Sequence, residues 1–309
     1  MPNDGGCVTE RERGLGLLLG LACGDALGRP VEFQSAAQIE RTHGRVTEML
    51  ANGTHGQPAG RITDDTEMAL CIARSLAEHS EFVPEDIASR FVEWYESDPF
   101  DIGLMTMDAL RQIRDGAGWD EAGQAVWESR PEGQNAGNGS VMRCAPYAIA
   151  FADQPGRLAA VSRQSSAITH ADPRCTSGCA IFNRMLAGLL TGESRPLEVA
   201  LDALGSEAPD ELVTALEAIP DGIDPSELQS SGYVVHTLQT GLYHGLTADS
   251  AEDAIVAAVN MGNDTDTVGA VAGAVAGARF GVADLPERWS SELSHDDELR
   301  TLAADLATL

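Results

Sequence analysis

Two short acidic clusters near opposite ends of the chain constrain its fold more than any other feature. The first is TDDT at residues 63–66, and the second is DTDT at residues 264–267. Adjacent carboxylates repel one another and lose their hydration when they are buried, so a fold that buries both clusters must supply compensating positive charge. The ligands on offer are all oxygen, with no Cys or His, and they suit a hard divalent cation such as Mg²⁺ or Mn²⁺.

The clusters have a second interpretation as two ordinary helix N-termini. Thr and Asp are preferred caps, and acidic residues stabilise the first turn of a helix. This interpretation accounts for one Asp in each cluster but not for the doubling in both. We therefore predict that the fold joins the clusters around two cations, about 3.5–4 Å apart, as in metal-assisted hydrolases.

Composition favours close-packed helices over sheets. Aromatic residues make up only 5% of the chain, and Ala and Gly are abundant where β-branched and aromatic runs are few. Residues 14–28 are predicted to form a helix whose small residues, at three- and four-residue spacing, permit close contact with another helix. Strands do not alternate with helices as a parallel sheet requires. We predict an all-α fold and, although 309 residues could form two domains, a single domain over residues 1–309.

Two segments depart from this helical pattern. Residues 192–230 are the most polar region and are expected to form a peripheral excursion with two short helices. Residues 15–23 resemble the core of a secretory signal, but acidic residues dilute the preceding basic region and Asp25 interrupts the apolar run. A buried first helix is the better interpretation of this segment.

The net charge of −28 limits the partners of the chain. All 20 basic residues are Arg, against 48 acidic residues. So acidic a surface repels nucleic acid and anionic membranes, and neither is expected as a partner. The charge is dispersed along the chain, which is typical of a protein from a salt-rich cytoplasm where screening suppresses self-repulsion.

The cysteines show no dense disulfide framework, which favours reduced thiols in a cytosol. Cys175 and Cys179 are four residues apart, with His170 nearby, and could suggest a zinc site. A fourth ligand is not evident, so we favour two small buried thiols on one helix face. The six cysteines are Cys7, Cys23, Cys71, Cys144, Cys175 and Cys179.

Several short segments, taken in order, resemble the ADP-ribosylglycohydrolase family, which includes the dinitrogenase-reductase-activating glycohydrolases and the ADP-ribosylarginine and ADP-ribosylserine hydrolases. The resemblance spans residues 14–281. Its segments are GLACGDALG at 20–28 with Glu32 after it, TDDT at 63–66, FDIG at 100–103, GNGSVMR at 137–143, Thr169 with His170, and NDTDT at 263–267.

The resemblance implies an all-α orthogonal helix bundle with two Mg²⁺ or Mn²⁺ ions and with ADP-ribose in a cleft beside them. One departure is Asn263, where a second Gly is usual in the family. Asn tolerates the left-handed backbone, so the turn is expected to survive. The metal ligands that the resemblance implies are Thr63, Asp64, Asp65, Asp264, Asp266 and Thr267.

The resemblance also assigns residues to substrate. His170 matches a substrate-contacting position, although a capping or core His is an alternative. For Arg143 we favour a structural role as an ion-pair partner. Residues 137–140 would offer N–H groups and a hydroxyl to a diphosphate, although they could form an ordinary Gly-rich turn. The substrate-binding residues expected are Glu32, Gly137, Asn138, Gly139, Ser140, Met142 and His170.

The implied reaction is hydrolysis of the bond between ADP-ribose and an acceptor, either a modified protein or a small molecule. Asp101 and Glu32 are the candidates for proton transfer. Their alternatives are a helix N-cap for Asp101 and a surface loop position for Glu32. A non-catalytic ADP-ribose-binding or structural relative, and a hydrolase of free nucleotide or nucleoside conjugates, are the alternative functions.

Overall fold

The structure is a computed structural model that describes residues 8–309, so Cys7 lies outside the described residues. This part of the chain is helical and contains no β-strand, which confirms the predicted all-α class. The helices are α1 (Glu10–Gly28), η1 (Arg29–Val31), α2 (Ala36–His43), α3 (Asp64–His79), α4 (Pro84–Glu96), α5 (Leu104–Arg114), α6 (Trp119–Ser129), α7 (Pro146–Ala150), α8 (Pro155–Ala167), α9 (Pro173–Leu190), α10 (Pro196–Leu204), η2 (Gly205–Glu207), α11 (Asp210–Glu217), η3 (Pro225–Glu227), α12 (Val234–Thr247), α13 (Ala251–Val259), α14 (Thr265–Phe280), η4 (Val282–Asp284), α15 (Glu287–Ser290) and α16 (Asp296–Leu306).

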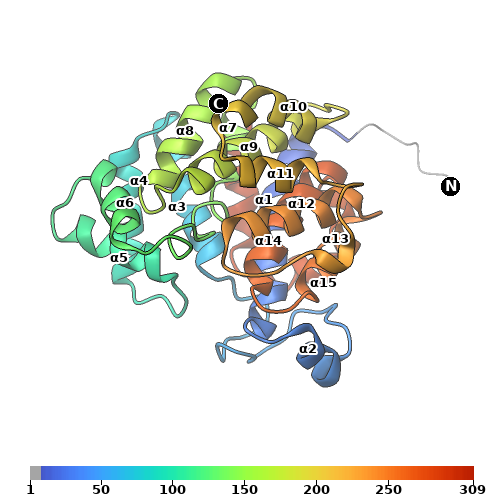
Figure 1. Ribbon diagram of the computed structural model, residues 1–309. Coiled ribbons are helices and arrows are strands. Elements are labelled where there is room, and N and C mark those ends of the chain that lie inside the picture. The colour runs from blue at the N-terminus through green and yellow to red at the C-terminus, as the bar shows by residue number, and fades with distance from the viewer. Residues whose placement is uncertain (1–7) are drawn as a thin grey trace.

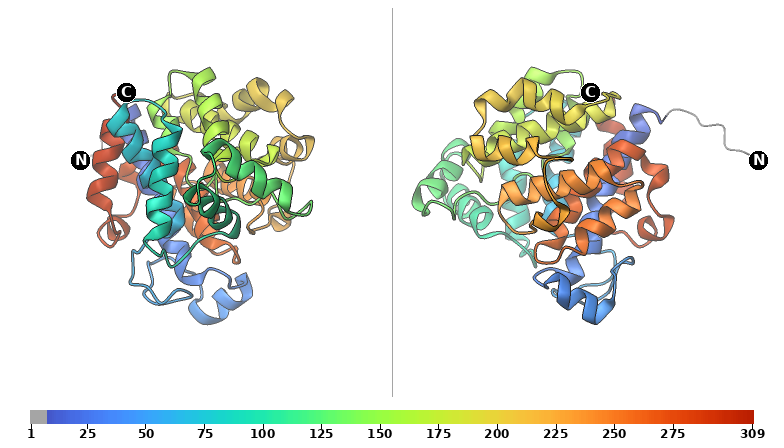
Figure 2. Two further views of the ribbon diagram at one scale, coloured as in Figure 1. Left: turned by 90° about the vertical axis from the view of Figure 1, so that its left-hand side faces the viewer. Right: turned by 45° about the vertical axis from the view of Figure 1, so that its right-hand side comes forward.

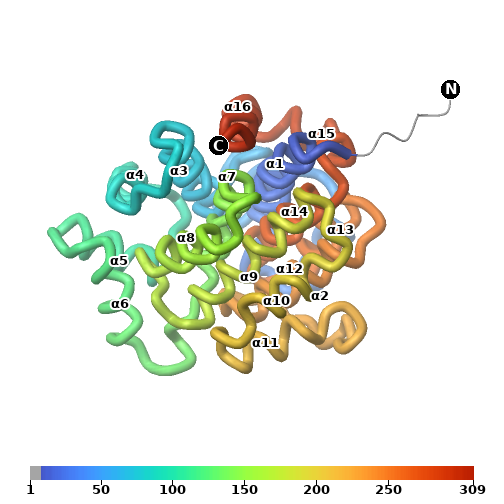
Figure 3. The backbone as a smooth tube through the Cα atoms, turned by 90° about the horizontal axis from the view of Figure 1, so that it is seen from above, coloured from blue at the N-terminus to red at the C-terminus, as the bar shows by residue number. Residues whose placement is uncertain are grey.

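Helices α1 and α14 lie side by side in the middle of the molecule (Figure 1, Figure 3). Their contact is a row of glycines. A Cβ added at Gly20 would lie 2.1 Å from the carbonyl oxygen of Gly273, and one added at Gly24 would lie 2.0 Å from that of Gly269. Larger side chains along this row would hold the axes of the two helices about 8–10 Å apart and would prevent so close a contact. The close contact predicted for residues 14–28 is therefore present.

Because α1 and α14 run in opposite directions, the end of α1 meets the start of α14. Buried Asp25 in the last turns of α1 then places the start of α3. Its carboxylate accepts hydrogen bonds from the backbone N–H of Thr63 at 3.0 Å and of Thr66 at 3.2 Å, and from the Thr66 hydroxyl. Burial raises the pKa of Asp25 to about 6, against these hydrogen bonds. Three segments distant in sequence thus converge at one point.

The outer parts of the molecule surround this centre. Figure 2 shows α2 and the loop after it projecting from one end, beyond the end of α1. The polar segment 192–230 contains α10 and α11, whose apolar side chains Leu197 and Leu212 are buried. Within residues 8–309, no helix combines the length and the apolar character needed to cross a membrane.

Candidate active site

A cleft of about 980 Å³ opens where the C-terminal end of α1 meets the N-terminal ends of α3 and α14. The segment after α4, the glycine loop at residues 133–139 and residues 230–233 form its other walls. Most of the predicted site residues line this cleft: Glu32, Asp64, Asp101, Gly137, Asn138, Gly139, Met142, His170, Asp264, Asp266 and Thr267. The other three, Thr63, Asp65 and Ser140, are buried and do not line the cleft.

The two acidic clusters meet at the floor of the cleft. Thr63 is the N-cap of α3, and Asp264 immediately precedes the first residue of α14, so both clusters do lie at helix N-termini. The hydroxyl of Thr267 donates to the Asp65 carboxylate at 3.3 Å, and that of Thr63 donates to the same oxygen at 3.3 Å. The helix-terminus interpretation is therefore correct about where the clusters lie. It does not explain why the buried carboxylate of Asp65 accepts hydrogen bonds from hydroxyls of both clusters.

The junction has an excess of buried acidic groups. Among residues 8–309, the second carboxylate oxygen of Asp65 is buried and has no hydrogen-bond partner. Burial, reinforced by neighbouring carboxylates, raises the pKa of Asp64, Asp65 and Asp266 well above the usual range. Within residues 8–309, no Arg forms an ion pair with these three groups. An unsatisfied, all-oxygen and strongly acidic donor set fits a hard divalent cation.

The glycine loop is tied to the second cluster through Asn138. Its side-chain amide donates to Asp264 at 2.8 Å and to the hydroxyl of Thr237 at 2.9 Å. This hydrogen bond opposes the burial that raises the pKa of Asp264. Carboxylate oxygens of Glu32, Asp264 and Asp266 lie within 4.8 Å of one another. The Asn138 side chain is therefore engaged in orienting an acidic residue.

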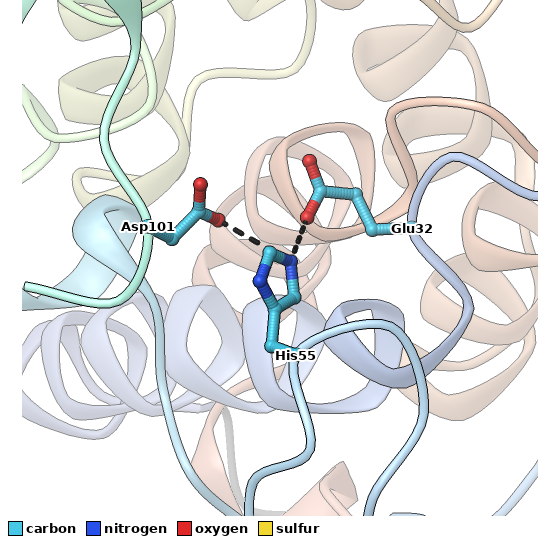
Figure 4. Close-up of side chains that lie close together, drawn as sticks. All are labelled: Glu32, His55 and Asp101. Atoms are coloured by element: carbon cyan, nitrogen blue, oxygen red, sulfur yellow. Dashed lines mark hydrogen bonds and ion pairs between the residues drawn. The ribbon is translucent and has the colours of Figure 1, made fainter.

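The two candidate proton-transfer residues are joined by a histidine that the sequence did not single out. Figure 4 shows the ring of His55 between the carboxylates of Glu32 and Asp101. The His55 Nε2 atom lies 2.5 Å from Glu32 Oε2 and 3.7 Å from Asp101 Oδ2. Glu32 is only 6% exposed, so the surface interpretation of this residue is wrong. Gly103, not Asp101, is the N-cap of α5, so the capping interpretation of Asp101 is also wrong.

Burial dominates the electrostatics of this pair. It raises the pKa of Glu32 to about 9, and the negative charges of Asp101 and Asp264 contribute in the same direction. Burial also raises the pKa of Asp101, although the charge of His55 opposes the shift. Both carboxyls therefore hold a proton more readily than free side chains do.

A buried arginine fixes the loop that carries His55. Arg29, at the end of α1, is fully buried, and within residues 8–309 its guanidinium donates to backbone carbonyls alone. The loop wraps around this guanidinium, so the position of His55 depends on a residue outside the loop. The carbonyl acceptors are Leu50, Asn52, Pro58 and Arg61, at 2.9–3.1 Å.

His170 lines the cleft and lies against the glycine loop. A Cβ added at Gly139 would lie 2.8 Å from Cε1 of this ring, so only glycine permits the contact. The ring is buried, with Nδ1 2.7 Å from the hydroxyl of Thr169. Burial, and then the positive charge of Arg143, lowers the pKa of His170 to about 3. The imidazole is therefore neutral at physiological pH.

The structure places Ser140 and the nearby thiols behind the cleft wall. The Ser140 hydroxyl accepts a hydrogen bond from Ser166 at 2.9 Å, and the thiol of Cys179 donates to it. The thiol of Cys175 donates to the Gly137 carbonyl at 3.2 Å. Among residues 8–309, the side-chain groups spaced to hold a metal include neither cysteine. The zinc alternative therefore finds no support in this geometry.

Arg143 differs from its prediction. It is fully buried, but no carboxylate in the described part of the chain pairs with it. Its guanidinium instead lies 4.5 Å from the centre of the Phe91 ring and donates to the Thr169 hydroxyl at 2.7 Å. The predicted ion pair is wrong because the charge is held by an aromatic face and a hydroxyl.

The mouth of the cleft carries exposed apolar side chains. Phe33 is 70% exposed and Leu104 is 66% exposed, and both line the cleft. Phe33 has a positive φ of 63°, held by its N–H bond to the carbonyl of Asn263 at 2.7 Å. Asn263 itself has a φ of 61°, which confirms the left-handed turn predicted there. Unsatisfied apolar surface at a cleft mouth is typical of a contact with substrate.

These features define a class: an all-helical protein with a cleft in which oxygen ligands gather between helix N-termini. Comparison with known proteins gives the family. Residues 7–309 match the model of the ADP-ribosylglycohydrolase family, and the chain belongs to that family.

Individual relatives agree over nearly the whole chain. The ADP-ribosyl-(dinitrogen reductase) glycohydrolase of Rhodospirillum rubrum is 36% identical over 286 residues, covering 92% of this chain and 91% of that protein. The ADP-ribosylarginine hydrolase Tri1 of Pseudomonas putida is 32% identical over 303 residues, covering 96% and 78%. A solved structure described as an ADP-ribosylglycohydrolase-related protein complex superposes with a TM-score of 0.82 at 32% identity, covering 97% and 98% of the two chains.

Proposed function

We propose that this protein is a metal-dependent hydrolase that cleaves the glycosidic bond between ADP-ribose and an acceptor. The observation that carries the proposal is the junction of the two acidic clusters, with the unpartnered oxygen of Asp65 at its centre. Membership of the family and the hydrolase names of its relatives supply the substrate class.

The junction would hold two divalent cations, Mg²⁺ or Mn²⁺. When bound, they would balance the buried carboxylates and supply Lewis-acid polarisation of oxygen atoms on the ribose. The residues that would hold them are Thr63, Asp64, Asp65, Asp264, Asp266 and Thr267.

The glycine loop would bind the diphosphate. The backbone N–H groups of Gly137, Gly139 and Ser140 donate to no group in the described part of the chain, so they are free for a ligand. Ser140 is buried behind the wall, where its hydroxyl is engaged, so the loop would act through the N–H groups of Gly137 and Gly139, which line the cleft. Free backbone N–H groups in a turn form a concavity suited to an anion. Met142 and His170 would complete this wall.

Proton transfer would occur beside the acidic junction, where Glu32 lies close to Asp264 and Asp266. Cleavage at the anomeric carbon passes through an oxocarbenium-like state, which nearby carboxylates stabilise. Glu32 can hold a proton at Oε2 and exchange it with His55 Nε2, its nearest neighbour. Asp101 is the second candidate, because its Oδ2 faces the same ring. The acceptor would leave past Phe33 and Leu104 at the mouth.

We also propose that the chain forms one domain and acts in a reducing, salt-rich cytoplasm. The central contact of α1 with α14 joins residues from both ends of the chain, which supports one domain. The five described cysteines are all free and buried, and the charge of −28 suits high salt.

The test is release of ADP-ribose from a panel of conjugates. Arginine-linked, serine-linked and small-molecule conjugates would each be incubated with Mg²⁺, with Mn²⁺ and with a chelator. We expect cleavage of at least one linkage with either metal and none with the chelator. If the folded protein cleaves no conjugate with either metal, the hydrolase proposal is wrong and the non-catalytic alternative replaces it.

A further inference from the structure

A buried positive charge lies directly behind the glycine loop. Arg143 is fully buried, and no carboxylate among residues 8–309 pairs with it. Its guanidinium donates to the hydroxyl of Thr169 at 2.7 Å, and that hydroxyl lies 2.7 Å from Nδ1 of His170. The three side chains form a continuous hydrogen-bonded row from the core to the cleft.

The chemistry of the three groups determines which atom donates and which atom accepts in each hydrogen bond of this row. A guanidinium only donates, so Thr169 must accept from Arg143. The hydroxyl has one proton, and Nδ1 of His170 is the acceptor within its reach. If Nδ1 carried the proton instead, the buried hydroxyl hydrogen would have no acceptor, which costs about 1–3 kcal/mol. A neutral His170 therefore carries its proton on Nε2.

The Nε2 atom faces the glycine loop. A Cβ added at Gly139 would lie 3.1 Å from it, and one added at Gly137 would lie 3.3 Å from it. Both glycines line the cleft, as does His170. The N–H of His170 is therefore presented where the free N–H groups of the loop are.

We propose that Arg143 and Thr169 are positioning residues that hold His170 as an Nε2–H donor to the ligand diphosphate. This inference rests on the proposed function, because that function supplies the anion. Donors in a polarised row strengthen one another, so the buried charge of Arg143 reaches the anion through two hydrogen bonds. No step of the proposal requires His170 to gain or lose a proton.

The acidic lining of the cleft suits an anion-binding group that carries no exposed positive charge. The floor of the cleft is lined by acidic residues, among them Glu32, Asp64 and Asp266, whose charge the cations would balance. No Arg of residues 8–309 lines the cleft, and the sequence contains no Lys. A neutral imidazole backed by a buried guanidinium supplies attraction for an anion without placing a mobile cation beside the metal ligands.

The variants Thr169→Val and Thr169→Ser separate the effect of the hydroxyl from the effect of the side-chain shape. Thr169→Val is isosteric but breaks the row, whereas Thr169→Ser keeps the hydroxyl. Ser162→Ala is the matched control, since it deletes another buried hydroxyl with two partners, Leu158 and Asn183, outside the cleft. Thermal unfolding of each variant would show that it is folded.

Two measurements test the proposal. The ¹⁵N spectrum of His170 in the ligand-free protein reports the tautomer, and calorimetry with saturating Mg²⁺ reports ADP-ribose affinity. We expect the Nε2–H tautomer in the wild type and in Thr169→Ser, and a mixed or reversed tautomer in Thr169→Val. We expect the affinity for ADP-ribose to fall about 10-fold in Thr169→Val and to stay within about 2-fold in the other two variants.

The outcomes distinguish this inference from the proposed function. An Nδ1–H tautomer in the wild type overturns the inference, as does a folded Thr169→Val protein that binds ADP-ribose as tightly as the wild type. If the wild type does not bind ADP-ribose, the proposed function is wrong and the inference about the diphosphate falls with it.

Discussion

The hydroxyl of Thr267 donates to the carboxylate of Asp65 at 3.3 Å, and this bond joins the two ends of the chain at the floor of the cleft. Thr267 lies in the first turn of α14, and Asp65 lies in the first turn of α3. Two helix N-termini therefore point into one site, and their dipoles favour negative charge there. Within the described part of the chain, one buried oxygen of Asp65 still lacks a hydrogen-bond partner, which is why we propose cations in the site.

The glycine contact between α1 and α14 positions this junction, and a substitution that adds a single methyl group tests the contact. Gly20→Ala would place a Cβ 2.1 Å from the carbonyl oxygen of Gly273, so the helices must separate. We expect a loss of at least about 1–3 kcal/mol in the free energy of unfolding, measured with urea. Gly156→Ala is the control, because nothing lies within 4 Å of its added Cβ. Equal stability of the two variants would contradict the close contact.

The stability of the metal-free protein should fall as the pH rises. Burial raises the pKa of Glu32 from 4.5 to about 9, so the folded state binds more protons than the unfolded state between these values. The contribution is therefore fully present below pH 4.5 and is lost as the pH rises through about 9. Asp64, Asp65 and Asp266 shift in the same direction.

Urea unfolding in chelator, repeated at intervals from about pH 5 to about pH 9, would measure this dependence. Saturating Mg²⁺ should flatten it, because the cations replace the protons as the compensating charge. A chelated protein that becomes more stable over this range would show that the carboxylates already have adequate partners.

Molar salt should stabilise the protein. Screening relieves the repulsion among 48 acidic side chains, of which only some pair with the 20 arginines. We expect the melting temperature to rise from low salt to molar NaCl, with metal kept saturating so that metal binding is not mistaken for screening. A melting temperature independent of salt would argue against adaptation to a salt-rich cytoplasm.

Glu32→Gln and Asp101→Asn test the proton-transfer role while keeping size and shape. We expect one of them to lose about 10²–10⁴-fold in kcat while it still binds ADP-ribose. Glu48→Gln, at a side chain 58% exposed and outside the cleft, is the matched control. Near-full activity of both test variants on every cleaved linkage would mean that another group transfers the proton.

The features of the fold and the site that depend on local sequence pattern could be predicted from the sequence. The all-α class, the close-packed first helix and the left-handed turn at Asn263 follow from composition, small-residue spacing and backbone preference. Both acidic clusters were visible because their carboxylates are adjacent in the chain.

The sequence did not reveal residues whose role depends on tertiary contacts. Asp25 looked like an interruption of an apolar run, yet it holds the start of α3. His55 lies in a loop whose path is set by a distant guanidinium, that of Arg29, so no local spacing points to it. For Arg143 the shortage of cations suggested an ion pair, whereas an aromatic ring and a hydroxyl hold its charge. These contacts join segments with no periodic relation to one another.

The central claim is that both ends of the chain build one site for two adjacent cations. Electron paramagnetic resonance of the Mn²⁺-loaded protein tests this claim most directly, because two ions within about 4 Å are spin-coupled. We predict two Mn²⁺ per chain with a coupled spectrum, and loss of the coupling in Asp266→Ala. Isolated Mn²⁺ signals at full loading, or no bound Mn²⁺, would contradict the account.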